Sequence, residues 1–226
     1  MSADDQKRRA GEAAAERVES GMVVGLGTGS TAAWFVRALA GRKLDIVGVP
    51  TSQATADLAT SLGIRIAELG ETKTIDLTVD GADECGPGLS LIKGGGAALL
   101  REKLVWEAST RCVVIADAAK HVKTLGKFPL PIEVVRFGHV HTGQKLADIA
   151  AEFELQPPRL RKAERGIVVT DGGNVIYDMM PGVIADPAIL GQALKSVTGV
   201  VDHGLFLDLA DEALVGTDEG VVRLTP

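Results

Sequence analysis

Acidic and basic side chains alternate with glycines between Asp80 and Lys103, where the sequence reads DGADECGPGLSLIKGGGAALLREK. Asp80 ends an apolar run that predicts a buried strand, and open parallel sheets bind ligands at the carboxyl ends of their strands. Gly81 permits a sharp turn, so Asp80 and Asp83 can face one crevice. Two neighbouring carboxyls can differ in pKa, one ionised and one protonated, which suits acid and base chemistry. From spacing alone, a structural turn in which both aspartates accept from local amides is the alternative.

A lysine and three glycines precede the next predicted helix. The run Lys93 to Gly96 places several backbone amides at the positive end of that helix, beside a fixed cation, and such donors suit a developing oxyanion. Glu102 lies one turn beyond Ala98, on the same helix face, where an inward carboxylate could act as a general base. An exposed Glu102 paired with a basic neighbour is the alternative that spacing leaves open.

A second glycine-rich loop, GLGTGST at residues 25–31, lies between a predicted strand and a predicted helix. Its glycines, its three hydroxyls and the helix behind it predict a phosphate site, whereas a tight turn with Ser30 as the helix cap is the simpler alternative. It is a poor dinucleotide fingerprint, because Ser30 replaces the last glycine and the acidic residue Asp45 stands at the wrong end of the next strand. The segment TSQAT at residues 51–55 could add hydroxyls to the same crevice.

Together these groups predict one reaction. A phosphate is held at the first loop, carboxylates remove and return protons, and amides with a lysine stabilise an enediolate. That chemistry is proton transfer next to a carbonyl, an aldose–ketose isomerisation, and it requires no metal and no nucleotide.

The elements that must position these residues form two patterns. Strands and helices alternate through the first half, which predicts a Rossmann-like, doubly wound, mostly parallel sheet. The second half reads β-α-β-β-α-β, a ferredoxin-like α+β arrangement with a hairpin across Gly172 and Gly173. We therefore expect an α/β protein with a catalytic domain at residues 1–128 plus 206–226 and a smaller domain at residues 129–205. We also expect the last strands of the chain to return to the first sheet.

Composition narrows the class of protein. Of 226 residues, 46% are hydrophobic and 24% are charged, which fits a globular chain with a real core. The net charge of −6 without a long basic run argues against nucleic acid as a partner. Cys85 and Cys112 show no disulfide or metal-ligand pattern, and no stretch resembles a signal peptide or membrane span. We expect a soluble, cytoplasmic protein.

The sequence resembles the type A ribose-5-phosphate isomerase family along essentially its whole length. The matching stretches are GLGTGST, TSQAT, DGADE, KGGGAALLREK, FPLPIEV, TDGGNVI and LADEALVGT. The resemblance implies interconversion of D-ribose 5-phosphate and D-ribulose 5-phosphate through a cis-enediol, with no cofactor. It implies that Glu102 is the general base, that Asp80 assists ring opening, and that Asp83 and Lys93 handle the O1 and O2 hydroxyls and the enediolate charge. The substrate-binding residues that we expect are Thr28, Gly29, Ser30, Thr31, Gly81, Ala82, Gly94, Gly95, Gly96, Lys120 and Lys7.

The resemblance also implies a homodimer or homotetramer that binds a pentose 5-phosphate. Two other functions compete with it. A sugar-phosphate-sensing module would keep the phosphate loop and could lose the acids, yet Asp80, Asp83 and Glu102 are all present. A nicotinamide-dependent dehydrogenase disagrees with Ser30 and with the missing acidic residue.

Several other residues are interpreted as structural. His139 and His141 could pair on a strand as metal ligands, but no third ligand is convincing, so a surface or interface role is favoured. His203 is interpreted as structural and Cys85 as a bystander. Trp34 and Trp106 are expected in the core.

Overall fold

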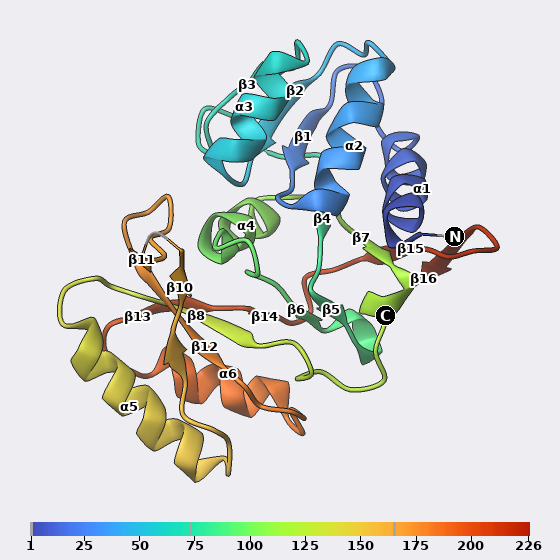
Figure 1. Cartoon of the computed structure of the whole chain (residues 1–226). Coiled ribbons are helices and arrows are strands. Elements are labelled where there is room, and N and C mark those ends of the chain that lie inside the picture. Colours follow the sequence, from blue (N-terminus) through green and yellow to red (C-terminus); the bar gives the residue numbers. More distant parts are fainter. Residues whose placement is uncertain (1, 73, 165) are drawn as a thin grey trace.

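A computed structural model describes residues 2–72, 74–164 and 166–226, and its largest element is a seven-stranded sheet with the order β16-β15-β7-β4-β1-β2-β3 (Figure 1). All neighbouring strands are parallel except the β15–β16 pair at one edge. The strands are β1 Val23–Leu26, β2 Val47–Pro50, β3 Arg65–Ile66, β4 Leu77–Gly81, β7 Cys112–Asp117, β15 Glu212–Gly216 and β16 Val221–Leu224. Every residue of β7 is buried, as expected for a central strand covered on both faces.

Helices cover both faces of this sheet. On one face lie α1 Ala3–Ala15, α2 Ser30–Gly41 and α3 Gln53–Ser61, whose apolar side chains share one core with the strands. On the other face lies α4 Leu99–Glu107, whose Trp106 is buried against Phe206. The doubly wound α/β sheet expected from the alternating pattern is therefore confirmed, and the two last strands return to it.

Local chemistry explains where these helices begin and end. Ser2 and Asp5 form a reciprocal capping box at the start of α1, and the Ser52 hydroxyl accepts from the Thr55 amide at the start of α3. At the end of α2, Gly41 is the last helical residue and Lys43 takes the left-handed backbone, with a φ of 52°.

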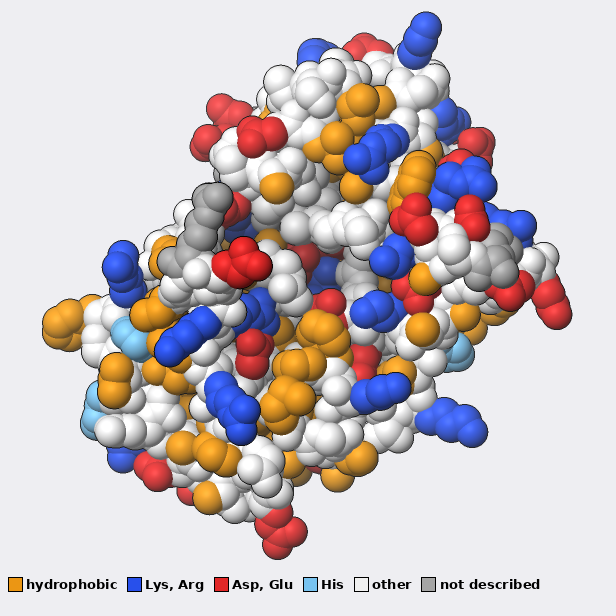
Figure 2. All heavy atoms as spheres, in the orientation of Figure 1, with side chains coloured by type: hydrophobic (Ala, Val, Ile, Leu, Met, Phe, Trp, Pro, Cys, Tyr) orange, Lys and Arg blue, Asp and Glu red, His pale blue; other side chains and the backbone are white. Residues whose placement is uncertain are grey.

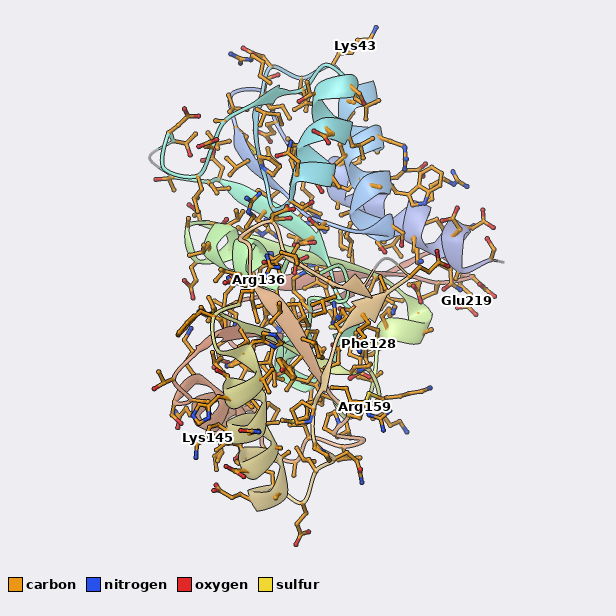
Figure 3. The ribbon with its side chains drawn as sticks, turned by 60° about the vertical axis from the view of Figure 1, so that its left-hand side comes forward. Lys43, Phe128, Arg136, Lys145, Arg159 and Glu219 are labelled. Carbon is orange, nitrogen blue, oxygen red and sulfur yellow. The ribbon has the colours of Figure 1, made fainter. Side chains whose placement is uncertain are left out.

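The second half forms a four-stranded antiparallel sheet with the order β13-β8-β12-β9, the ferredoxin-like arrangement that was predicted. Two helices accompany it, and Figure 1 shows this part in yellow and orange beside the first sheet. The elements are β8 Leu130–Val134, α5 His139–Glu152, β9 Arg159–Leu160, β12 Val175–Met179, α6 Pro187–Lys195 and β13 Val200–His203. In the view of Figure 3, Lys43 lies at the top of the molecule and Lys145 lies on α5 in the lower half.

The predicted hairpin across Gly172 and Gly173 is only partly present. The turn closes, since the Gly173 amide donates to the Thr170 carbonyl and Val169 bridges Val175. The strand before it is diverted, because β11 Gly166–Ile167 pairs with β10 Lys162–Ala163 as a separate two-stranded sheet.

A small three-stranded sheet lies between the two larger ones in Figure 1. It consists of β5 Glu84–Cys85, β6 Leu91–Ile92 and β14 Leu205–Phe206. Strand β6 leads directly into Lys93 and the three glycines. It pairs with β5 from the first half of the chain and with β14 from the second half, so both halves hold this segment. The domain division expected from the sequence, residues 1–128 plus 206–226 and residues 129–205, stays a prediction. None of the described helices is long and apolar enough to span a bilayer.

One expectation about side chains is corrected, and one alternative is excluded. Trp34 is only half-buried, because its indole N–H reaches the surface carboxylate of Asp4 at 3.0 Å, whereas Trp106 is in the core as predicted. His139 and His141 lie at the start of α5, not on a strand, and the Nδ1 atom of His139 lies 3.0 Å from the Tyr177 hydroxyl. In residues 2–72, 74–164 and 166–226, no group of three or more His, Cys, Asp or Glu side chains could hold a metal ion.

Candidate active site

A cavity of about 130 Å³ opens at the carboxyl ends of β1 and β4, the edge at which parallel sheets bind ligands. Figure 2 shows a hollow near the centre of one face, with basic and acidic side chains gathered around it. The residues that line the cavity are Lys7, Thr28, Gly29, Ser30, Thr31, Gly81, Ala82, Asp83, Lys93, Gly94, Gly95, Gly96, Glu102 and Lys120. The structure thus brings together every predicted site residue except Asp80, and the small volume suits a sugar phosphate better than a dinucleotide.

At one end, the first glycine loop turns into α2. Gly29 is the N-cap residue, with a φ of 103° that favours glycine, and it makes no side-chain cap. Ser30 is the first helical residue and does not cap the helix; its Oγ lies 3.1 Å from the Lys7 ammonium, which reaches across from α1. The structural alternative of a Ser30 cap is therefore wrong. Lys7 and the helix N-terminus supply positive potential where a phosphate would bind.

The hydroxyls of TSQAT lie behind the loop and do not line the cavity. The Thr28 Oγ1 atom lies 2.7 Å from the Thr51 hydroxyl and 2.8 Å from the Ser52 hydroxyl. The Thr55 hydroxyl donates to the Gly27 carbonyl at 2.9 Å. The expectation that this segment adds hydroxyls to the crevice is thus corrected: its hydroxyls hold Thr28 in place from the side away from the cavity.

Asp80 is fully buried one layer below the cavity. Its Oδ1 atom accepts from the amides of Thr28 at 3.0 Å and Gly81 at 2.7 Å, and its Oδ2 atom lies 3.1 Å from the Lys93 ammonium. A Cβ on Gly27 would lie 2.5 Å from the Asp80 Cα atom, so only glycine allows this approach. Burial raises the pKa of Asp80, opposed by Lys93 and the two amides.

Lys93 is the cation at the centre of the site. Its ammonium lies 3.1 Å from Asp80 and 3.4 Å from the Oε1 atom of Glu102, and it donates to the Gly81 carbonyl. The rings of Trp106 and Phe206 lie 5.5 Å from it. Burial opposes the charge on Lys93, but Asp80 and Glu102 outweigh it and raise the pKa, so this lysine stays a cation.

Glu102 faces inward from the first turn of α4, so the alternative of an exposed, locally paired Glu102 is wrong. Its side chain is 6% exposed, and its Oε2 atom has no hydrogen-bond partner among the described residues. Burial raises its pKa to about 8, with Lys93 opposing and the carboxylates Asp80 and Asp83 adding to the shift. A carboxylate of this basicity is matched to proton transfer near neutral pH.

The neighbours of Glu102, Arg101 and Lys103, point away from the cavity. Arg101 lies 3.4 Å from the Asp171 carboxylate, and the buried Lys103 donates to Asp202 at 2.6 Å and to the His203 carbonyl at 2.8 Å. Both contacts join α4 to the second half of the chain, Arg101 at the surface and Lys103 in the interior.

The three glycines form one wall of the cavity. The Gly95 amide donates to the Asp83 Oδ2 atom at 2.7 Å, and a Cβ on Gly95 would lie 2.6 Å from the Asp83 Oδ1 atom. Within the part of the chain that the structure describes, the Gly96 amide donates to no protein acceptor. Asp83 and an available N–H group therefore lie on the same wall.

Sequence reasoning missed one contact on the outer side of this wall. The Arg161 guanidinium, from the segment between β9 and β10, donates to the carbonyls of Gly94 at 2.9 Å and Gly95 at 3.1 Å. No local signal marked Arg161, because it lies 66 residues from Gly95 along the chain.

Cys85 and His203, which the sequence analysis interpreted as a bystander and a structural residue, keep these interpretations. Cys85 is buried, and burial raises its thiol pKa to about 11, which leaves the thiol protonated at neutral pH and agrees with a bystander. His203 is buried as well, and burial lowers its pKa to about 4, so the ring is neutral, in keeping with a structural role.

A parallel sheet with an anion-binding loop, a buried base and amide donors in one cavity defines an enzyme that moves protons within a small phosphorylated substrate. A family model described as ribose 5-phosphate isomerase A (phosphoriboisomerase A) matches residues 47–220. The chain belongs to the ribose 5-phosphate isomerase A family, as the resemblance of its motifs suggested.

Individual relatives agree with this family over the full chain. Ribose-5-phosphate isomerase A of Caulobacter sp. (strain K31) is 83% identical over 226 residues and covers all of both chains. The solved structure of ribose 5-phosphate isomerase A from Methanocaldococcus jannaschii matches with a TM-score of 0.92 at 38% identity, again over all of both chains. A D-ribose-5-phosphate isomerase in complex with phospho-erythronic acid matches with a TM-score of 0.93 at 39% identity and the same full coverage.

Proposed function

We propose that the Lys93 cavity is the site at which this chain, a ribose-5-phosphate isomerase, interconverts D-ribose 5-phosphate and D-ribulose 5-phosphate. One observation carries the proposal. Glu102, a buried carboxyl with a pKa of about 8, lies 3.4 Å from a buried cation in the same cavity as the GLGTGST loop. A base, a charge stabiliser and an anion site within one small cavity are the parts that the isomerisation needs.

The phosphate of the substrate binds at the exposed end of the cavity. Gly29, Ser30 and Thr31 surround it with backbone amides and two hydroxyls at the start of α2, and Lys7 adds a cation from α1. The amide and hydroxyl of Thr28 are bonded to Asp80, Thr51 and Ser52, so Thr28 shapes the loop without donating to the phosphate. This end is accessible and built largely from backbone, so it contributes affinity and orientation, and the reacting carbons extend toward Glu102.

At the buried end, Glu102 takes the proton from C2 of the open-chain aldose. The electron pair of that C–H bond forms the C1–C2 double bond and moves charge onto O1, giving the cis-enediolate. We propose that O1 and O2 then bind to Lys93, Asp83 and the Gly96 amide, while the Gly95 amide holds Asp83. A proton passes from O2 to O1, and Glu102 returns its proton to C1, which leaves the ketone at C2.

Asp80 acts in this scheme by holding Lys93. Its carboxylate does not line the cavity, whereas Lys93 does. The ammonium of Lys93 lies 3.1 Å from this carboxylate, and both side chains are almost fully buried. The part in ring opening implied by the family resemblance stays a prediction. Lys120 lines the cavity beside Lys7, and we propose that its ammonium contacts the substrate, as do Gly81, Ala82 and Gly94.

The related isomerase bound to phospho-erythronic acid supports this arrangement. Phospho-erythronic acid joins a phosphate to a planar carboxylate, and a carboxylate resembles the enediolate in shape and charge. We propose that the same compound binds here with its phosphate at GLGTGST and its carboxylate at the Lys93 end.

Two finer expectations are also proposals. We propose that the chain works as a homodimer or homotetramer in the cytoplasm. Phe137 is 93% exposed and Val140 is 62% exposed at the start of α5, and large apolar side chains this exposed favour a contact with another protein surface. Light scattering on the purified protein would give the oligomeric state.

The deciding experiment follows ribulose 5-phosphate formation from ribose 5-phosphate in EDTA, by wild type and by Glu102→Gln. We expect turnover by wild type and a loss of about 10²-fold or more in the variant with substrate binding nearly intact, as removal of a general base should give. A variant that retains a tenth of the activity would contradict the role of Glu102. Binding of ribose 5-phosphate without turnover by wild type would instead favour a sugar-phosphate-sensing module.

A further inference from the structure

The outer face of the glycine wall carries an arginine that the reaction scheme does not use. Arg161 is 15% exposed, and four of its N–H groups have partners. Its Nε and Nη2 atoms hold both oxygens of Asp178 on β12, and its Nη1 atom donates to the carbonyls of Gly94 and Gly95. The bidentate pair fixes the plane of the guanidinium, so the two remaining donors have a set direction.

The planar trans peptide relates those carbonyls to the cavity. In such a peptide, the C=O of one residue and the N–H of the next point in opposite directions. The direction of the Gly94 carbonyl therefore sets the direction of the Gly95 N–H group. In the same way, the Gly95 carbonyl sets the direction of the Gly96 N–H group. The first of these amides donates to Asp83 at 2.7 Å, and Gly96 lines the cavity with its amide available.

Besides Arg161, one backbone hydrogen bond supports the glycine wall: the Ala97 amide donates to the Gly94 carbonyl at 3.0 Å and closes a turn across Gly95 and Gly96. Gly95 and Gly96 are exposed and belong to no helix or strand, and the glycine backbone adopts many conformations at little cost. Two carbonyls held by one rigid cation restrict this freedom. A hydrogen bond to a carbonyl also polarises its peptide and strengthens the N–H on the other side.

We propose that Arg161 is a positioning residue for the isomerisation: it sets the direction of the Gly96 amide, which stabilises the enediolate, and of the Gly95 amide, which holds Asp83. This inference rests on the proposed function of the Lys93 cavity and adds a residue from the second half of the chain to it. Arg161 lies behind the wall and never touches the sugar.

The test separates the two ends of the cavity. We would measure kcat, KM and two inhibition constants, one for inorganic phosphate and one for phospho-erythronic acid, in wild type and Arg161→Met. We expect kcat about 50-fold lower and phospho-erythronic acid binding about 30-fold weaker, since loss of oriented oxyanion donors has effects of this order. The KM and the phosphate constant should change less than threefold, because GLGTGST is not in contact with Arg161.

Two matched controls remove other arginines. Arg159 is exposed two residues away at β9 and is labelled in Figure 3, so Arg159→Met removes the same charge from the same segment. Arg101 contacts Asp171 at 3.4 Å, so Arg101→Met removes another contact between the two halves of the chain. Both variants should keep activity within threefold of wild type.

Two further variants keep the inference open to test if Arg161→Met does not fold. Arg161→Lys keeps the charge but lacks the planar fork, and Asp178→Asn loosens the guanidinium; each should lower kcat about fivefold to tenfold with KM unchanged. The inference is overturned if the folded variants keep kcat within threefold of wild type. It is also overturned if phosphate and phospho-erythronic acid weaken equally, which indicates general loosening. A wild type without turnover would instead contradict the proposed function.

Discussion

The two ends of the cavity are built in different ways. The phosphate end is a backbone loop at one helix N-terminus, close to the surface, with Lys7 as its cation. The reacting end is a buried cluster in which one lysine lies between Asp80 and Glu102. Backbone amides bind an anion without changing protonation, whereas buried ionisable groups change one another's pKa. In the proposed function, different kinds of structure therefore carry substrate binding and proton transfer, and variants at the two ends should differ in their effects on KM and kcat.

The largest effect is expected for Lys93→Met. Removal of this cation takes charge stabilisation from the enediolate and leaves Asp80 buried without its partner. We expect kcat to fall by about 10³-fold and the free energy of unfolding to fall by about 3–5 kcal/mol. Steady-state kinetics and denaturant unfolding would measure the two changes.

A double variant separates catalysis from stability at this position. Lys93→Met with Asp80→Asn removes the unpaired charge, so much of the lost stability should return while the activity stays low. Recovery of activity in the double variant would show that Lys93 serves only to neutralise Asp80.

The pH dependence of kcat/KM should report the ionisation of Glu102 at the buried end of the cavity. Glu102 must be ionised to accept a proton, and burial raises its pKa to about 8. We therefore expect kcat/KM to rise about tenfold per pH unit up to about pH 8 and then to level off. The substrate phosphate ionises near pH 6, so the profile is best measured between pH 7 and 9.5. A profile that is flat over this range would show that Glu102 is already ionised at pH 7.

At the phosphate end, Thr31→Ala should raise KM about tenfold with little change in kcat. The hydroxyl lines the cavity beside the α2 N-terminus, and loss of one hydrogen bond to a charged group is worth about 1.5–3 kcal/mol. Inorganic phosphate inhibition should weaken by the same factor. A large fall in kcat at unchanged KM would argue against simple phosphate anchoring and would weaken the contrast between the two ends.

The smallest effect concerns stability at Glu102. Its pKa is raised above the unfolded value, so the folded state holds the proton more tightly, and stability falls as pH rises from about 4.5 to about 8. Glu102→Gln removes this dependence and should raise Tm at pH 8 by about 2–4 °C for each kcal/mol regained. Thermal melts of both proteins at pH 5 and pH 8 would check it; an equal difference at the two pH values would contradict the raised pKa.

Much of the fold follows from local patterns. Continuous apolar runs such as CVVIAD indicate strands buried on both faces, and their alternation with helices leaves a doubly wound sheet as the natural arrangement. The β10–β11 pair was not expected, because short strands with exposed residues carry no alternating pattern and pair only where the neighbouring chain permits.

The sequence by itself determined which chemical groups the site holds: hydroxyls among glycines, as a phosphate site needs, and a lysine, amides and a glutamate spaced along one strand–loop–helix unit, as the proposed enediolate needs. Those groups are local, and backbone geometry relates them over a few residues. Tertiary structure alone decided that Asp80 lies beneath the cavity, that Thr51 and Ser52 hold Thr28 from behind, and that Arg161 reaches Gly94 and Gly95. Burial and contacts between distant segments depend on strand order and on the packing of the two halves, which no single stretch of sequence encodes.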